Sequence, residues 1–191
     1  MSSARPRIYL AGPEVFLPDA LAVGAEKCRL AAAAGLEGVF PLDAQLDLTG
    51  LPPGEQARRI SAANEGLMRT CDALLANLTP FRGVSMDSGT AFEVGFMRAL
   101  GRPLAGYTNV TAAYAERARA YRSRGPAPMD GDRPDVAVED FGLAENLMIE
   151  AAILASGGSV VRSGVAPGAE LTDLAAFAQA LGVLASTLAA R

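Results

Sequence analysis

Two carboxylates in one short segment, Asp87 and Glu93, are the side chains best suited to chemistry. Asp87 or Ser88 is a good N-cap residue and predicts a helix from there to about Leu100, with Gly101 as its C-terminal stop. Glu93 would then lie a turn or so from the helix N-terminus, where the helix dipole favours an ionised carboxylate. A carboxylate that is ionised but poorly hydrated is suited to attack an electrophilic carbon.

The predicted helix places Glu93 away from its solvated side. At about 100° per residue, Arg98 and Arg102 lie on the opposite side of the helical wheel. The helical neighbours of Glu93 are Gly89, Thr90, Phe96 and Met97. Two interpretations follow. Glu93 is either a nucleophile or a structural glutamate with a buried partner, because burying an unpaired carboxylate is expensive.

Composition excludes several other kinds of site. The 191 residues include no histidine, which removes imidazole bases, Ser-His-Asp and Cys-His pairs, and histidine metal ligands. Cys28 and Cys71 form no CxxC pair, so we expect no metal site and no disulfide, and we interpret both as small core residues. Dinucleotide and P-loop sites lack their glycine-rich motifs. The net charge of −4 argues against a nucleic-acid partner.

The length of the chain favours one domain, and we predict a single domain over residues 1–191. The N-terminal residues lack the apolar stretch of a signal peptide, which predicts a cytoplasmic protein. The uncharged segment Leu174–Ala190 falls short of the ~20 strongly apolar residues that a membrane span needs. We therefore expect it to be a buried or interface helix, and we expect no membrane association.

Apolar runs of strand length alternate with segments of helical length, which predicts an α/β fold with a parallel sheet. The predicted strands are Arg7–Ala11, Gly38–Pro41, Asp72–Leu78, Pro103–Tyr107 and Ser159–Val161. The predicted helices are Pro18–Ala34, Pro53–Thr70, Ser88–Leu100, Thr111–Arg122, Leu143–Ala155 and Glu170–Ala190. Right-handed crossovers give a doubly wound, flavodoxin- or Rossmann-like sheet of five strands in the order 2-1-3-4-5, with helices on both faces.

Ligands of such folds bind outside the carboxyl ends of the strands, so the residues that follow each strand are candidates for a site. Gly12 follows the first strand and leaves room for a ligand beside the backbone. The segment Arg122–Asp140 is rich in Gly, Pro, Asp and Arg, and we interpret it as a long exposed connection or, alternatively, as a lid over a pocket.

Five segments carry an ordered set of motifs, namely Ile8–Pro13, Phe40–Asp43, Cys71–Gly83, Asp87–Gly95 and Glu145–Ile149. The core Asp-x-Gly-Thr-x-x-Glu-x-Gly and the run Glu-Asn-Leu-Met are the most specific of them. Over residues 7–155 the chain closely resembles the nucleoside 2-deoxyribosyltransferases. The resemblance implies retaining transfer of deoxyribose between bases, with 2′-deoxyribonucleosides and free nucleobases as small-molecule partners and no cofactor.

The resemblance implies roles for three catalytic residues. Glu93 would be the nucleophile that attacks C1′ of the nucleoside and forms a covalent deoxyribosyl-enzyme, in a double displacement like that of retaining glycosidases. Tyr9 would hold the Glu93 carboxylate through its hydroxyl, or would simply pack in the core. Asp87 would bind the sugar 5′-hydroxyl or the base region, would only cap the helix, or would do both.

The resemblance also implies that a neighbouring subunit lends Asn146 and Met148 to close the sugar pocket, which requires at least a symmetric homodimer. The plain alternatives are an ordinary helix start at Asn146 and a core methionine at Met148. The alanine-rich helix Glu170–Ala190 is a candidate subunit interface.

Further residues are expected to line the substrate pocket, namely Gly12, Phe16, Asp43, Asn64 and Gly89. Phe16 would stack on the base or, alternatively, belong to the core. Family members often carry a second aspartate near the position of Asn64 to protonate the departing base. An amide cannot do this, so Asp43, Asp87 or water would supply the proton.

Two other functions remain as alternatives. A related N-glycosidase would hydrolyse the glycosidic bond of a deoxynucleoside or of its monophosphate, and Arg82 and Ser88 are available for the phosphate. A nucleotide-sensing module would bind its ligand without turnover. The transferase is distinguished from the hydrolase by whether an added free base captures the sugar.

Overall fold

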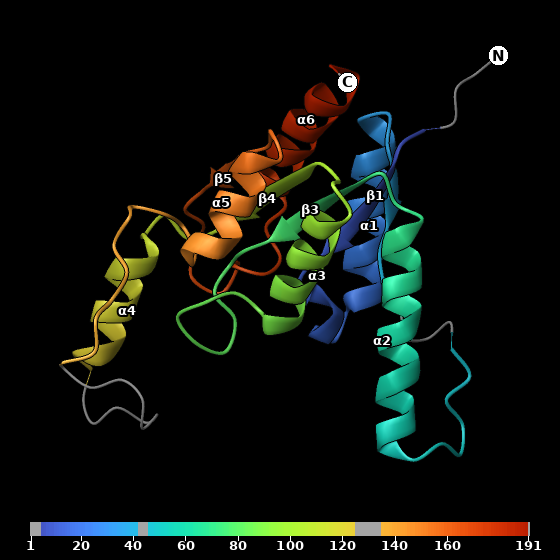
Figure 1. Ribbon diagram of the computed structural model, residues 1–191, viewed down its shortest axis with the longest axis horizontal. Coiled ribbons are helices and arrows are strands. Elements are labelled where there is room, and N and C mark those ends of the chain that lie inside the picture. The colour runs from blue at the N-terminus through green and yellow to red at the C-terminus, as the bar shows by residue number, and fades with distance from the viewer. Residues whose placement is uncertain (1–4, 42–45, 125–134, 191) are drawn as a thin grey trace.

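The computed structural model describes residues 5–41, 46–124 and 135–190 of the chain. Within this part, five parallel strands form one sheet in the order β2-β1-β3-β4-β5 (Figure 1). The strands are β1 (Arg7–Ala11), β2 (Glu37–Val39), β3 (Ala73–Asn77), β4 (Leu104–Thr108) and β5 (Val160–Arg162). The predicted fold class and strand order are confirmed.

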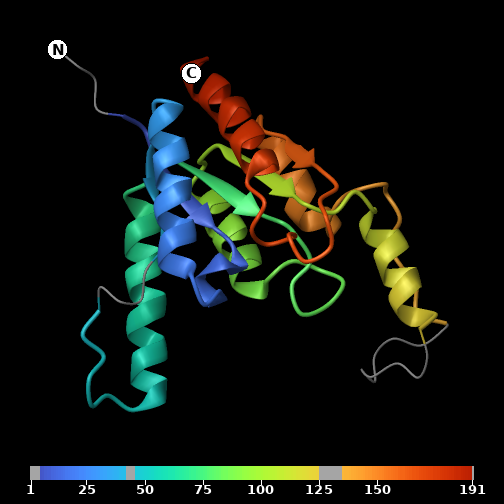
Figure 2. The same ribbon diagram turned by 180° about the vertical axis from the view of Figure 1, so that it is seen from behind.

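Helices cover both faces of the sheet. The helices α2 (Pro53–Arg69), α3 (Ser88–Ala99) and α5 (Leu147–Ala155) lie in front of the sheet in Figure 1. On the other face, seen in Figure 2, lie α1 (Ala20–Ala33) and α6 (Ala175–Ala189). The short 3-10 helix η1 (Pro13–Phe16) follows β1, and α4 (Tyr114–Arg122) projects away from the sheet in both views.

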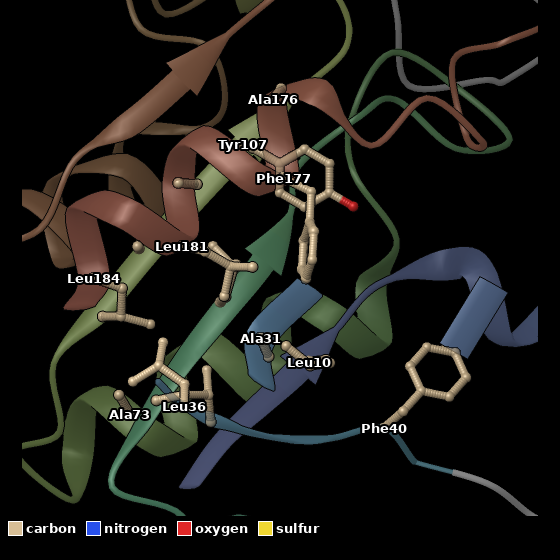
Figure 3. Packing of buried hydrophobic residues seen from close by; sticks show 14 residues of the cluster. Leu10, Ala31, Leu36, Phe40, Ala73, Tyr107, Ala176, Phe177, Leu181 and Leu184 are labelled. Carbon is tan, nitrogen blue, oxygen red and sulfur yellow. The ribbon is translucent and has the colours of Figure 1, made fainter. Parts of the chain in front are cut away.

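The core beneath α1 and α6 joins aliphatic and aromatic side chains (Figure 3). Leu10 of β1 packs in the same cluster as Phe177 and Leu181 of α6. Tyr107 of β4 meets the Phe177 ring edge-on, with the ring centroids 5.6 Å apart. This core therefore covers the face of the sheet that turns away from α3.

The second core lies on the opposite face of the sheet. It contains the strand residues next in sequence to those of the first core, because successive side chains of a strand point to opposite faces. Tyr9 of β1 and Leu74 of β3 are paired in register and pack in one cluster with Val94 of α3. The alternation along β1 thus places Tyr9 on the face that carries α3 and fixes the side from which it reaches Glu93.

Four helices begin later than predicted, and before two of them a polar side chain accepts from a backbone N of the first turn. The predicted starts at Pro18, Thr111, Leu143 and Glu170 are corrected to Ala20, Tyr114, Leu147 and Ala175. In α5, Asn146 Oδ1 accepts from the Met148 backbone N at 3.0 Å, which makes Asn146 the cap. Before α6, Asp173 Oδ1 accepts from the Ala175 backbone N at 2.8 Å.

β1 has its predicted bounds, and the other strands differ from theirs by only one or two residues at each end. Residues 125–134 of the predicted connection Arg122–Asp140 lie outside the described residues, so both interpretations of that segment stay predictions. No helix in the described part of the chain combines the length and the apolar character that crossing a membrane would require.

Candidate active site

Glu93 and Tyr9 meet between α3 and β1. Tyr9 is fully buried, and its hydroxyl donates to Oε1 of Glu93 at 2.7 Å. Tyr9 therefore belongs to the core and also holds Glu93, so its two interpretations are compatible. Because a strand in the middle of the sheet carries the tyrosine, the carboxylate is held by a rigid part of the fold.

The carboxyl group of Glu93 has an unusual acidity. Burial raises its pKa from 4.5 to about 7, the hydrogen bond from Tyr9 opposes this rise, and the nearby charge of Asp87 adds to it. The raised pKa runs against the expectation that the place of Glu93 near the helix N-terminus favours the ionised form, and burial is its largest cause. A carboxyl group whose pKa is strongly perturbed in this way marks a candidate functional site.

Asp87 is the N-cap of α3, as predicted. Its Oδ2 accepts from the backbone N of Thr90 at 2.9 Å and from the Thr90 hydroxyl at 3.1 Å. Both bonds hold the carboxylate at the start of the helix, where its charge acts on Glu93. The helix ends at Ala99, and Gly101 follows with a φ of 70°, the left-handed conformation that terminates many helices.

A cavity of about 410 Å³ opens beside Glu93, between α2 and α3. Gly89, Phe92 and Glu93 form its wall on α3. Its wall on α2 consists of residues at helical spacing, namely Ala57, Ile60, Ser61, Asn64, Glu65 and Met68. The structure thus brings together three of the predicted residues, Gly89, Asn64 and Glu93, around a volume in the range of small-molecule sites.

Glu65 was missed by sequence reasoning, although it adds an ionisable group to the α2 wall. Glu65 could have been identified from the sequence because it directly follows Asn64 on the same helix. A larger hollow of about 550 Å³ lies next to α4 and is lined by Tyr114, Tyr121 and Glu139, among others. That hollow has none of the predicted site residues in its described wall, so we place the candidate active site at Glu93.

Gly12 lies between β1 and η1, and its missing side chain is required by packing. A methyl group on Gly12 would collide with the carboxylate of Glu14 and would lie 3.0 Å from Cβ of Asn77. The space that we expected beside the Gly12 backbone is therefore filled, on this side, by Glu14. Whether a ligand approaches Gly12 from another side stays a prediction.

Glu14 belongs to a buried polar network that sequence reasoning missed. Its Oε1 accepts from Lys27 Nζ at 2.6 Å, from Asn77 Nδ2 at 3.0 Å and from the Tyr107 hydroxyl at 2.7 Å. Burial alone would raise the pKa of Glu14, but the charge and hydrogen bond of Lys27 and the hydrogen bond of Tyr107 lower it below its ordinary value. The overlooked signal was Lys27, which lies at helical spacing from Ala31 on the buried face of α1.

Phe16 is not a core residue, which corrects one of its two interpretations. Its side chain is 54% exposed at the end of η1. The ring stacks on Phe81 with centroids 5.4 Å apart, and the Arg82 guanidinium lies over both rings. Arg82 has a φ of 56°, uncommon for a residue other than glycine. A stacked aromatic surface therefore exists here, built from η1 and the loop between β3 and α3.

Asn146 and Met148 begin α5 and do not take part in the described wall of the cavity beside Glu93. Asn146 Nδ2 donates to Glu139 Oε2 at 3.0 Å, so the residue both caps its helix and contacts a neighbouring segment. Met148 is 71% exposed, so the alternative of a core methionine is wrong.

Asp43 lies outside the described residues, so nothing is said of its position. Within the described part of the chain, no group of three or more Cys, Asp and Glu side chains is arranged to hold a metal ion.

A family pattern and a relative each match most of this chain. The family pattern described as nucleoside 2-deoxyribosyltransferase matches residues 8–148. An uncharacterized protein of Schizosaccharomyces pombe is 36% identical over 169 residues, which cover 81% of this chain and 80% of that protein.

Solved structures show the same likeness. A structure of a 2-desoxiribosyltransferase from Leishmania mexicana matches with a TM-score of 0.56 and 34% identity, over 75% of this chain and 85% of that one. A conserved protein from Enterococcus faecalis matches with a TM-score of 0.50 and 20% identity, over 84% of this chain and 92% of that one, and shows a shared fold.

Proposed function

The chain belongs to the nucleoside 2-deoxyribosyltransferase family, and we propose that it exchanges the base of a 2′-deoxyribonucleoside for a free nucleobase through a covalent bond to Glu93. The observation that carries this proposal is the Tyr9–Glu93 hydrogen bond of 2.7 Å at the edge of the cavity between α2 and α3. The name of the Leishmania mexicana protein, at 34% identity, supports the same type of reaction.

The reaction consists of two displacements at C1′ of the sugar. Tyr9 binds Oε1 of Glu93, so we assign the attack on C1′ to Oε2. The new bond from Glu93 to C1′ forms as the bond from C1′ to the base nitrogen breaks, and the base departs with that electron pair and takes up a proton. A second base then attacks C1′ from the vacated side and gives up its N–H proton to the group or water that protonated the first base. The bond to Glu93 breaks, its electron pair returns to the carboxylate, and the original β configuration is restored.

The other residues bind and orient the substrate in this proposal. Asp87, fixed by its bonds to Thr90, contacts the 5′-hydroxyl or the base region. Asn64 in the cavity wall contacts the base. Because Asn64 is an amide and cannot protonate the departing base, we assign that proton to Asp43, to Asp87 or to water. The exposed ring of Phe16 offers a stacking surface for a base.

Asn146 and Met148 complete the pocket of a second copy of the chain. Two observations support this part of the proposal: Met148 is 71% exposed, and neither residue takes part in the described wall of the cavity beside Glu93 of its own chain. Each subunit of a symmetric dimer would then contribute Glu93 to one pocket and Asn146 to the other.

The direct test of the activity is base exchange. The protein is incubated with deoxyinosine and free adenine, and the products are separated by chromatography. We expect deoxyadenosine and hypoxanthine in equal amounts. Hypoxanthine together with free deoxyribose, without any new nucleoside, would show a hydrolase instead, and binding of nucleoside without base release would show a sensor.

Subunit sharing is tested by mixing two inactive variants. Co-expressed Glu93→Ala and Asn146→Ala chains form mixed dimers. In one pocket of such a dimer, the Asn146→Ala chain supplies an intact Glu93 and the Glu93→Ala chain supplies an intact Asn146. With random pairing we expect about a quarter of the wild-type activity. Activity no greater than that of the two variants assayed separately would show that Asn146 serves the pocket of its own chain, or none.

A further inference from the structure

Glu145 is a buried carboxylate to which the proposed reaction assigns no role. Its side chain is fully buried and accepts from four donors on three segments of the chain. The Ser85 hydroxyl and the backbone N of Asn146 bond to Oε1. The backbone N of Met86, at 3.0 Å, and Nη2 of Arg117, at 3.2 Å, bond to Oε2. Both oxygens therefore hold a specific arrangement of neighbours.

One side of this arrangement is the loop that leads into α3. Ser85 and Met86 directly precede Asp87, and Met86 is itself buried. The Arg117 guanidinium, paired with Glu145, also donates to the Val84 carbonyl at 2.8 Å. Bonds at three successive residues thus fix the chain just before the Asp87 carboxylate, whose charge acts on Glu93.

The other side is the start of α5. The bond from the Asn146 backbone N to Glu145, at 3.0 Å, lies one residue before the helix. The same end of α5 is held from a different direction by Glu139, which accepts from Asn146 Nδ2 at 3.0 Å and from the Leu147 backbone N at 2.8 Å. Asn146 and the exposed Met148 therefore take their positions from two carboxylates.

We propose that Glu145 is a positioning residue that sets both halves of the shared pocket: Asp87 in its own subunit, and the Asn146–Met148 segment that this subunit lends to its partner. The proposal rests on the proposed function and adds a link between two pockets, because one side chain anchors a segment of each. A carboxylate is suited to this role, since only its two oxygens can accept from all four donors at once.

Neighbouring residues supply matched controls for each half. Ser85→Ala removes a contact of Glu145 with the Asp87 loop alone. Glu139→Gln weakens the contacts to the start of α5 alone. Glu145→Asp keeps the negative charge beside Arg117 but is one methylene shorter, so it preserves the charge pair while it shifts both segments.

The test pairs each of these variants with the two testers of subunit sharing, Glu93→Ala and Asn146→Ala, and measures base exchange by the co-expressed chains. Ser85→Ala should restore activity with Asn146→Ala but not with Glu93→Ala. Glu139→Gln should do the reverse. Glu145→Asp should restore activity with neither tester. With each of them, the base-exchange activity should be at least fivefold lower than that of co-expressed Glu93→Ala and Asn146→Ala.

Restoration of activity by Glu145→Asp with either tester would overturn the proposal, because one half of the pocket would then be intact without Glu145. A failure of folding would also give no activity, so each chain is first required to match the wild type in its circular dichroism spectrum and oligomer size. If Glu145→Asp fails this requirement, Arg117→Lys takes its place, with the same expected pattern.

Failure of the proposed function would give a different result. Wild-type protein without base exchange would contradict the transferase itself. Wild-type exchange with no restoration by the two testers would contradict subunit sharing alone. In that case the role of Glu145 is tested by the kcat/KM of the single chains. The loss of kcat/KM in Glu145→Asp should equal that in the Ser85→Ala/Glu139→Gln double variant. A loss no larger than that of Ser85→Ala would overturn the role of Glu145.

Discussion

Two glutamates on opposite faces of the sheet have opposite chemistry. Glu14 lies on the face covered by α1 and α6, where Lys27, Asn77 and Tyr107 all bind its Oε1. Glu93 lies on the face covered by α2 and α3, where Tyr9 donates one hydrogen bond to it. The pKa of Glu14 is lowered, whereas that of Glu93 is raised to about 7.

The difference shows what burial does to the pKa of a carboxylate with and without a cation among its partners in the described part of the chain. Beside Lys27, Glu14 is a charged part of the core and holds the turn after β1. Glu93 has a partner that donates a hydrogen bond but no positive charge, and a like charge nearby at Asp87. Under the proposed function Glu93 is the reactive carboxylate, and its burial costs stability, as functional sites often do.

The largest expected effect is the loss of base exchange in Glu93→Gln. The amide has the shape of the carboxyl group but cannot form the bond to C1′, so kcat should fall at least about 1,000-fold. Glu14→Gln, measured beside it by the same chromatographic assay, should retain far more activity wherever it folds. Equal losses in the two variants would remove the distinction between a reactive and a structural glutamate.

Lys27→Met tests the structural role of Glu14. This change leaves the Glu14 carboxylate buried without its cation, and the free energy of unfolding should fall by about 3–5 kcal/mol in urea titrations. The control is Arg29→Met on the same helix, where the pair with Glu26 is exposed and a far smaller loss is expected. Similar losses in both variants would contradict a special role for the buried pair.

Glu93→Gln should also stabilise the protein, but only at higher pH. The folded protein holds the Glu93 proton more tightly than the unfolded chain, with a pKa of about 7 against 4.5, so stability falls as pH rises through this interval. The shift corresponds to about 3 kcal/mol at most, and partial exposure lowers it to about 2 kcal/mol.

Urea titrations at pH 5 and pH 8 measure this effect. Glu93→Gln should exceed the wild type by about 2 kcal/mol at pH 8 and by much less at pH 5. An equal difference at the two pH values would show that the stability of the site does not depend on the ionisation of Glu93.

The smallest expected effect is a pair of opposite shifts in the pH profile of kcat/KM. Because Glu93 must be ionised to attack, activity should fall below about pH 7. Tyr9→Phe removes a hydrogen bond that lowers the pKa of Glu93, so the fall in activity should move to higher pH. Asp87→Asn removes a charge that raises the pKa and should move it to lower pH. Shifts in the same direction would contradict the assigned causes.

Local patterns of the sequence predict much of the fold. The apolar runs and their alternation with helical segments predict the five strands and their order, and the Asp87 cap with Gly101 predicts the bounds of α3. The helix starts were less accurate: Asn146 caps α5 instead of lying inside it, and Asp173 accepts from the first backbone N of α6 from a position before that helix.

The site was predictable to the extent that its residues occur in motifs along one helix or one strand. The direction of the pKa of Glu93 was not, because helix position is local whereas desolvation comes from the packing of β1 and α2 against α3. The Glu14–Lys27 pair and the contacts of Glu145 join segments far apart in the chain, so spacing alone could not reveal them.

Trapping the covalent intermediate tests the central claim most directly. The protein is incubated with a 2′-fluorinated deoxynucleoside, whose fluorine slows the second displacement, and is then digested and examined by mass spectrometry. The account predicts a fluorodeoxyribosyl group on the peptide that contains Glu93, with fragmentation placing it on that side chain. A label on any other residue, or no label while the enzyme turns over the normal substrate, would contradict it.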